Sequence, residues 1–220
     1  ANAMSWRDQL LEEGDFWQVY TKAKSVVGNK FNNRLTLMFF ILSTVLVFGW
    51  SALPLPMIET PILIGWVRHW AALGVGFTTS LLGFLIAGFS IFATLTNKNI
   101  FKTLAKIPYK KNGVESQLSQ FKFIFFNFIM IFLHYLSFMI FCLTIVLFFP
   151  ENGMITIPLG LVTADYPIAQ NIITSIGVVV TSTWFVLTAL MLKSFIWNLY
   201  QSVLLAIVLE EIIPNNVNEK

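Results

Sequence analysis

Residues 70–96 read WAALGVGFTTSLLGFLIAGFSIFATLT, a run of 27 residues without a charged side chain. As an α-helix this run would measure roughly 40 Å, which is longer than the hydrocarbon core of a bilayer, about 30 Å thick. Three further uncharged runs are long enough to cross a membrane as helices, and they cover residues 35–53, 123–149 and 170–192. The sequence therefore predicts an all-α polytopic membrane protein with four transmembrane helices, because backbone groups in lipid must be paired within the helix.

The composition of the whole chain agrees with this prediction. Hydrophobic residues make up 56 % of the 220 positions and charged residues only 11 %, whereas a soluble domain carries roughly 25 % charged residues. A soluble globular domain is therefore excluded, because the chain lacks the polar surface that water would have to cover.

Lysine and arginine are distributed unevenly between the segments that flank the four spans. Five precede the first span, six lie in residues 97–122, and Arg68 is the only one in the other two loops. The positive-inside rule then predicts a multi-pass membrane protein with both termini in the cytoplasm. We expect cytoplasmic interfacial helices in residues 1–34, a transmembrane domain in residues 35–192 with a basic cytoplasmic loop at 97–122, and a cytoplasmic helix and tail in residues 193–220.

Both cytoplasmic ends contain helical patterns. Ser5 to Asp8 fits a capping box, and Asp15 is suited to cap a second helix that ends near Gly28. Residues 194–213 are apolar nearly all round, apart from a polar stripe of Ser194, Asn198, Gln201 and Ser202. We expect this segment to continue the fourth span inward and to pack against other helices or a partner, because nothing else in the chain is an obvious cover for it.

Seven small residues recur along one stripe of the second span, with an average spacing near 3.67 residues. They are Ala72, Gly76, Thr79, Gly83, Ala87, Ser90 and Thr94. Small residues let helices approach closely in lipid, so the stripe predicts a packing seam within the subunit or between subunits. The alternative interpretation is the lining of a narrow pore.

The third and fourth spans carry patterns of their own. Thr174, Gly177, Thr181 and Thr188 share one side of the fourth span, which favours packing over a polar conduit because their hydroxyls can bond their own backbone. Nine phenylalanines spread around the third span and favour a lipid-facing position. His134, the only ionisable residue in any span, is expected to bond a neighbouring helix, with a proton relay or gate as the alternative.

Lysines recur every fourth residue after the second span, at Lys98, Lys102 and Lys106, with apolar residues on the opposite side. This pattern predicts that the second span continues as an amphipathic helix to Pro108. Together with Lys110 and Lys111, these lysines would bind lipid headgroups or an acidic cytosolic protein. Direct binding of nucleic acid is not expected, because stacking aromatic residues are lacking nearby.

The sequence shows no catalytic signature. It contains no Gly-rich phosphate loop, no nucleophile elbow and no His-Glu-x-x-His motif, and it has one cysteine, Cys142, and two histidines. We therefore expect neither an enzyme nor a metal or cofactor site. The spans also lack the carboxylates and arginines that coupled transport usually needs.

Residues 80–97, SLLGFLIAGFSIFATLTN, together with the four-span layout, resemble the membrane subunits of the Kiwa anti-phage defence system, the KwaA-like four-span bacterial proteins. The resemblance implies a homo-oligomeric component of the bacterial inner membrane that senses phage attack at the envelope and holds a cytosolic DNA-binding partner. The combined hypothesis is a membrane sensor and scaffold that oligomerises and recruits a cytosolic effector. The alternative hypothesis is an oligomeric pore that depolarises the cell.

Overall fold

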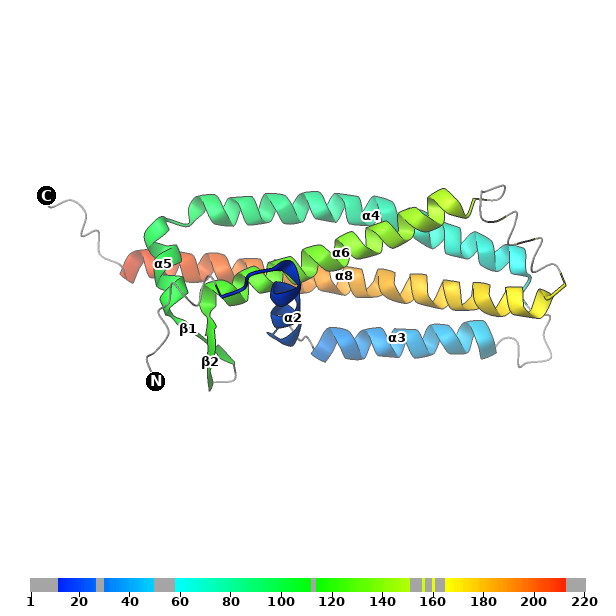
Figure 1. Ribbon diagram of the computed structural model, residues 1–220, viewed down its shortest axis with the longest axis horizontal. Coiled ribbons are helices and arrows are strands. Elements are labelled where there is room, and N and C mark those ends of the chain that lie inside the picture. Colours follow the sequence, from blue (N-terminus) through cyan, green and yellow to red (C-terminus); the bar gives the residue numbers. More distant parts are fainter. Residues whose placement is uncertain are drawn as a thin grey trace, which may run out of the picture. The chain divides into compact units, whose positions relative to one another are not determined.

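Long helices dominate the chain. The computed structural model describes residues 12–26, 30–49, 58–111, 114–150, 156, 160 and 165–212. Four helices in these ranges are long and apolar enough to cross a membrane, and they are α3 (Lys30–Gly49), α4 (Thr60–Leu95), α6 (Gln120–Phe148) and α8 (Pro167–Ile212). The predicted all-α membrane fold with four spans is thereby confirmed (Figure 1).

The chain forms two compact units, each assembled from separate segments. Unit 1 comprises residues 1–28, 84–133 and 193–220, and unit 2 comprises residues 29–83 and 134–192. Each of α4, α6 and α8 therefore contributes one part of its length to each unit. This division follows compactness and leaves the predicted division by membrane topology untested.

Unit 2 contains α3 and the parts of the three longer helices that fall within its residue ranges. One buried cluster joins Val47 of α3 to Leu63 of α4 and to Val178 and Val179 of α8. Polar side chains add bonds between the helices. Asn32 Nδ2 donates to the Leu190 carbonyl at 3.3 Å. Such bonds matter in lipid, where no water competes for the backbone groups.

Unit 1 holds the short elements. They are α2 (Phe16–Val26), α5 (Lys98–Lys106), β1 (Pro108–Lys111) and β2 (Val114–Ser119). The strands pair antiparallel, with Lys110 opposite Glu115 and Lys111 opposite Val114. As predicted, Asp15 caps α2, because its Oδ1 accepts from the Gln18 backbone N–H at 2.9 Å. The predicted capping box at Ser5 to Asp8 lies outside the described residues.

The second span does not continue unbroken to Pro108, so that prediction was wrong. α4 ends at Leu95, and the Thr96 hydroxyl turns back to bond the Phe92 carbonyl at 2.6 Å. Asn97 then caps a separate helix, α5, by accepting from the Asn99 backbone N–H. Asparagine favours caps over helix interiors because its side chain competes for local backbone groups, and this explains the break. The amphipathic character predicted for the segment is confirmed, since Ile100 and Leu104 are buried.

The lipid-facing position predicted for the third span is confirmed only in part. Within α6, Phe126 and Phe138 are almost fully buried, as are Ile131 and Tyr135. Phe125 and Phe148 are exposed, at 38 % and 42 %. Other phenylalanines of α6 make ring contacts with other helices, such as Phe128, which stacks on Phe89 of α4 at 4.4 Å between centroids. The spread of phenylalanines around α6 thus reflects packing on more than one side.

The apolar C-terminal segment finds partners within this chain. It continues α8 to Ile212, as predicted. Of the two predicted covers, other helices or a partner, the structure shows other helices, since Ala206 and Leu209 lie in one buried cluster with Phe92, Ile100 and Leu104. The cover is α5, which the sequence analysis treated as an extension of the second span.

Candidate functional site

The stripe of small residues on α4 faces away from the rest of the described chain. In unit 2, Ala72, Gly76, Thr79 and Gly83 are exposed, and in unit 1, Ala87, Ser90 and Thr94 are exposed. A Cβ atom added at Gly76 or Gly83 would meet nothing within 4 Å. Among the described residues, one hydrogen bond runs from the stripe to another helix, from the Thr79 hydroxyl to Met139 Sδ on α6 at 3.8 Å. The stripe is therefore not the seam by which α4 packs within the subunit, and the interface and pore interpretations remain predictions.

Close helix packing within the chain uses two other glycines of α4, which the sequence analysis did not single out. In unit 2, a Cβ on Gly74 would lie 2.6 Å from Cys142 Sγ, and in unit 1, a Cβ on Gly88 would lie 3.1 Å from Leu199 Cδ2. Buried positions on α4 follow each other at steps of three and four: Ala71, Gly74, Thr78, Leu81, Leu85, Gly88 and Phe92. Two faces of one helix thus have different roles, and small residues occur on both.

The basic side of α5 is solvent-facing. Its apolar side is buried in the cluster with α8, and Lys98, Lys102 and Lys106 on the opposite side are exposed. Lys110 on β1 is exposed too, while nothing is described of the Lys111 side chain. Lys106 and Lys110 each have an interaction partner in the structure. Lys98 and Lys102 therefore present the clearest positive surface on this helix.

The hairpin that follows α5 is joined to the start of α6. Tyr109 stacks on Phe123 with ring centroids 3.7 Å apart and planes inclined by 8°. The Gln120 backbone N–H donates to the Ile107 carbonyl at 2.9 Å. Burial raises the pKa of the Tyr109 hydroxyl. The sequence analysis missed this hairpin, although Asn112-Gly113 between two short segments is a recognised hairpin signal.

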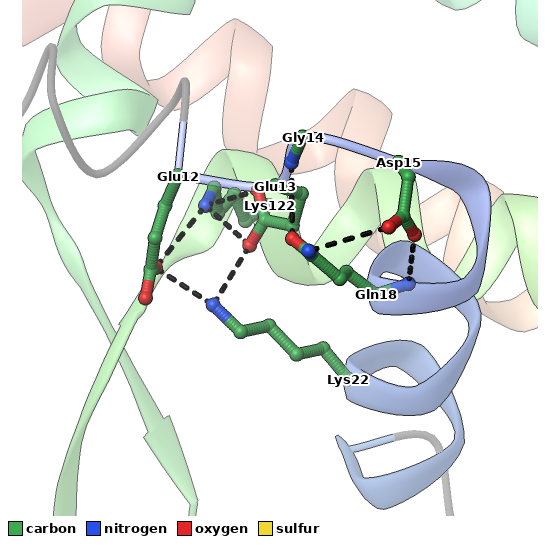
Figure 2. A network of polar contacts seen from close by, with 7 residues as sticks. All are labelled: Glu12, Glu13, Gly14, Asp15, Gln18, Lys22 and Lys122. Carbon is green, nitrogen blue, oxygen red and sulfur yellow. Dashed lines mark hydrogen bonds and ion pairs between the residues drawn. The ribbon is translucent and has the colours of Figure 1, made fainter.

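A buried ion cluster joins the N-terminal segment to α6 (Figure 2). Lys122 Nζ lies 2.6 Å from Glu13 Oε2 and 2.7 Å from Glu13 Oε1, and only 7 % and 6 % of these two side chains are exposed. Lys22 of α2 closes the network, at 2.8 Å from Glu12 and 3.1 Å from Glu13. The sequence analysis counted Lys122 only as one charge of the basic loop. A lysine and a glutamate 109 positions apart carry no local signal of their pairing.

The charges in this cluster shift its pKa values in opposite directions. Burial acts to raise the pKa of Glu13, but hydrogen bonds and charge attraction from Lys122 and Lys22 outweigh it, so the pKa of Glu13 is lowered. The pKa of Lys22 is raised, above all by its hydrogen bond to Glu12. Both shifts favour the charged forms, so near neutral pH the network holds the segment around Glu13 against the start of α6 within unit 1.

The polar side chains of the fourth span serve packing, as predicted. Thr181 and Thr188 are fully buried in unit 2, and their hydroxyls donate to backbone carbonyls four residues earlier, both at 2.8 Å. His134 accepts from Trp184 Nε1 at 3.1 Å, which confirms the predicted bond to a neighbouring helix. These groups therefore have partners inside the subunit, and a conduit along this side of α8 finds no support.

No protein-family model matches the chain, and no match was found among curated proteins or solved structures. Among the described residues no three His, Cys, Asp or Glu side chains gather as metal ligands would. Two exposed surfaces therefore remain as candidate sites, the small-residue stripe of α4 and the basic side of α5.

Proposed function

We propose that this protein is a membrane scaffold that self-associates through the small-residue stripe of α4 and recruits an acidic cytosolic protein through the basic side of α5. The observation that carries the proposal is the exposure of all seven stripe residues, while α4 packs inside the subunit through another face. Association of helices in lipid depends on close packing at small residues. A stripe left free by the subunit is therefore available to a second copy.

The recruiting surface follows from the structure of unit 1. Because the apolar side of α5 is buried against α8, its lysines are held in a fixed orientation. Fixed charges of one sign steer and select partners of the opposite sign. The recruited protein should bind on the cytoplasmic side of the membrane, because the lysine distribution favours a cytoplasmic location for this unit. A role in anti-phage defence, with a DNA-binding partner, rests on the resemblance to Kiwa membrane subunits.

Self-association is tested by native mass spectrometry of the protein released from nanodiscs. Gly83→Leu should shift the protein toward the monomer, because the larger side chain keeps two stripes apart. Ala93→Leu is the matched control, since Ala93 is also exposed on α4 but lies off the stripe. The proposal would be wrong if both variants kept the oligomer of the unmodified protein.

Recruitment is tested by charge reversal. Membranes bearing the Lys98→Glu/Lys102→Glu variant should lose a cytosolic protein that the unmodified protein retains, and raised salt should release the same protein. Lys24→Glu, on the exposed side of α2, is the control that changes charge elsewhere. Equal retention by all three proteins would refute recruitment through α5.

A pore is the second candidate function. It is favoured by the three hydroxyl residues on the exposed stripe, Thr79, Ser90 and Thr94. If several copies of the chain assemble with their stripes facing a common axis, the stripes would line a channel and would not form a packed interface. Ion flux through liposomes containing the purified protein, abolished by Gly83→Leu but not by Ala93→Leu, would favour this candidate over the scaffold.

A further inference from the structure

Unit 1 contains a cavity of about 290 Å³ between α4, α6 and α8. Pockets that bind small ligands run from roughly 300 Å³ upward, so this cavity lies at the small end of the range. Aromatic and aliphatic side chains form most of its wall, among them Phe89, Phe128 and Phe195. This cavity is distinct from the stripe and the basic side of α5, and the proposed function does not use it.

A buried amide lines the cavity. Asn127 on α6 is only 5 % exposed and lines the cavity. Among the hydrogen bonds between described residues none involves its side chain, whose atoms reach the cavity, since they are not among the fully buried atoms without a partner. Because this amide has no partner in the described protein and reaches the cavity, its hydrogen bond depends on what occupies the cavity. A ligand with a hydrogen-bonding group would satisfy this amide.

The polar lining is arranged along the helices. Asn198, Gln201 and Ser202 follow each other at helical spacing on α8, and Gln120 begins α6. On α6 the polar lining residues Gln120 and Asn127 alternate with the apolar Phe123, Ile124, Phe128 and Ile131. Polar and apolar side chains are therefore interleaved around the cavity. On its α8 side the polar stripe of the C-terminal segment alternates with Phe195, Leu199 and Leu205.

We propose that this cavity binds the acyl-ester portion of a glycerolipid, with the acyl chain among the phenylalanines and the ester carbonyl accepting a hydrogen bond from the Asn127 amide. None of the lining side chains is ionisable. A charged phosphate or carboxylate would therefore find no counter-ion inside, and burying it would be costly. The group that enters should be uncharged, as an ester is, and any phosphate should remain outside.

The experiment uses the full-length protein in nanodiscs containing a diacylglycerol or a phosphatidylglycerol, each with a photoactivatable diazirine on one acyl chain. A diazirine-bearing free fatty acid is the third probe. After illumination, mass spectrometry should find label on residues 120–131 and 195–205 with either ester lipid and not with the fatty acid. Label from both glycerolipids identifies the shared ester as the bound group, whereas label from the diacylglycerol alone identifies a neutral lipid.

Asn127→Leu should reduce this label about fivefold, the ratio expected when one hydrogen bond to a buried amide is lost, while label on exposed Ile91 of α4 stays unchanged. Asn33→Leu, at an exposed position of α3, is the matched control and should label like the unmodified protein. Gln201→Leu, at an exposed position of the lining, gives a second variant that does not disturb a buried site.

Thermal unfolding in lipid-free detergent provides an independent readout. A ligand site whose amide is unpaired when empty should become more stable with Asn127→Leu, and the increase should vanish when monoolein is added, because only the unmodified protein gains from the ligand. An asparagine with a purely structural role would instead lose stability on this change. That loss, or label on residues 120–131 no stronger than on Ile91, would overturn the proposal.

Discussion

Gly74 offers the sharpest test of how α4 packs within the subunit. A Cβ atom at this position would lie 2.6 Å from Cys142 Sγ and 3.2 Å from Cε1 and Cζ of Phe138. Both neighbours are fully buried, so neither has free space into which it can move. Gly74→Ala therefore forces α4 and α6 apart, or forces these side chains out of their rotamers.

The size of the effect follows from two opposing terms. Overpacking a well-packed core costs about 1–3 kcal/mol, while replacing glycine by alanine in a helix contributes up to about 1 kcal/mol of stability. The net result at Gly74 should be a loss of about 1 kcal/mol. At Gly83 an added Cβ meets nothing within 4 Å. For the monomer, only the gain in helix stability from replacing glycine by alanine therefore remains.

The assay is unfolding of the monomer by SDS in mixed micelles, followed by circular dichroism. Gly74→Ala should lower the midpoint, and Gly83→Ala should leave it unchanged or raise it. Cys142→Ala should rescue Gly74→Ala, because it removes the sulfur that the new methyl group would meet. The double variant should then be more stable than the sum of the single effects by about 1 kcal/mol, as coupled neighbours are.

Two results would refute this reasoning. If Gly74→Ala and Gly83→Ala shifted the midpoint equally, the two faces of α4 would not differ in packing. If Cys142→Ala failed to rescue Gly74→Ala, the contact between α4 and α6 would not be the cause of the loss.

Three further predictions concern single contacts. Because the pKa of Glu13 is lowered from its ordinary value near 4.5, the Glu13 ion pair stabilises the fold fully above pH 4.5 and loses this effect as the pH falls through the lowered pKa. Thermal unfolding measured at a series of pH values should show this loss of stability. Glu13→Gln should remove this pH dependence. Tyr135→Phe deletes the 3.0 Å bond from the tyrosine hydroxyl to the Thr188 carbonyl and should lower stability by about 0.6 kcal/mol, typical of bonds between membrane helices, measured by the same SDS titration. Asn97→Ala removes the cap of α5 and should lower the helix stability by about 1 kcal/mol, visible as faster amide hydrogen exchange in residues 98–106 with no change in unit 2.

The four spans could be predicted from the sequence because membrane insertion depends on a property of each segment alone. A run such as residues 70–96 needs only length and the absence of charge to form a helix in lipid. The cap at Asp15 and the continuation of the fourth span to Ile212 were predictable for the same reason, since both depend on neighbours within a few turns.

The seven small residues of α4 show what a periodic pattern leaves undetermined. Their spacing identified one stripe of α4 correctly, yet the stripe is exposed, and the glycines that pack within the subunit lie at Gly74 and Gly88. Periodicity tells which residues share a side of a helix. It carries no information on which side the rest of the chain covers.

The sequence by itself therefore determined the all-α fold with four apolar helices long enough to cross a membrane, and the amphipathic character of α5. It did not determine where α4 begins, at Thr60, ten residues before the predicted run. Only the tertiary structure decided that α5 covers the end of α8, that Lys122 pairs with Glu13, and that Asn127 remains unpaired beside a cavity. The physical reason is the separation along the chain between the residues that interact. Burial in lipid and helix capping act on each segment separately, whereas ion pairs and packed surfaces join residues far apart in the chain, whose meeting depends on the whole fold.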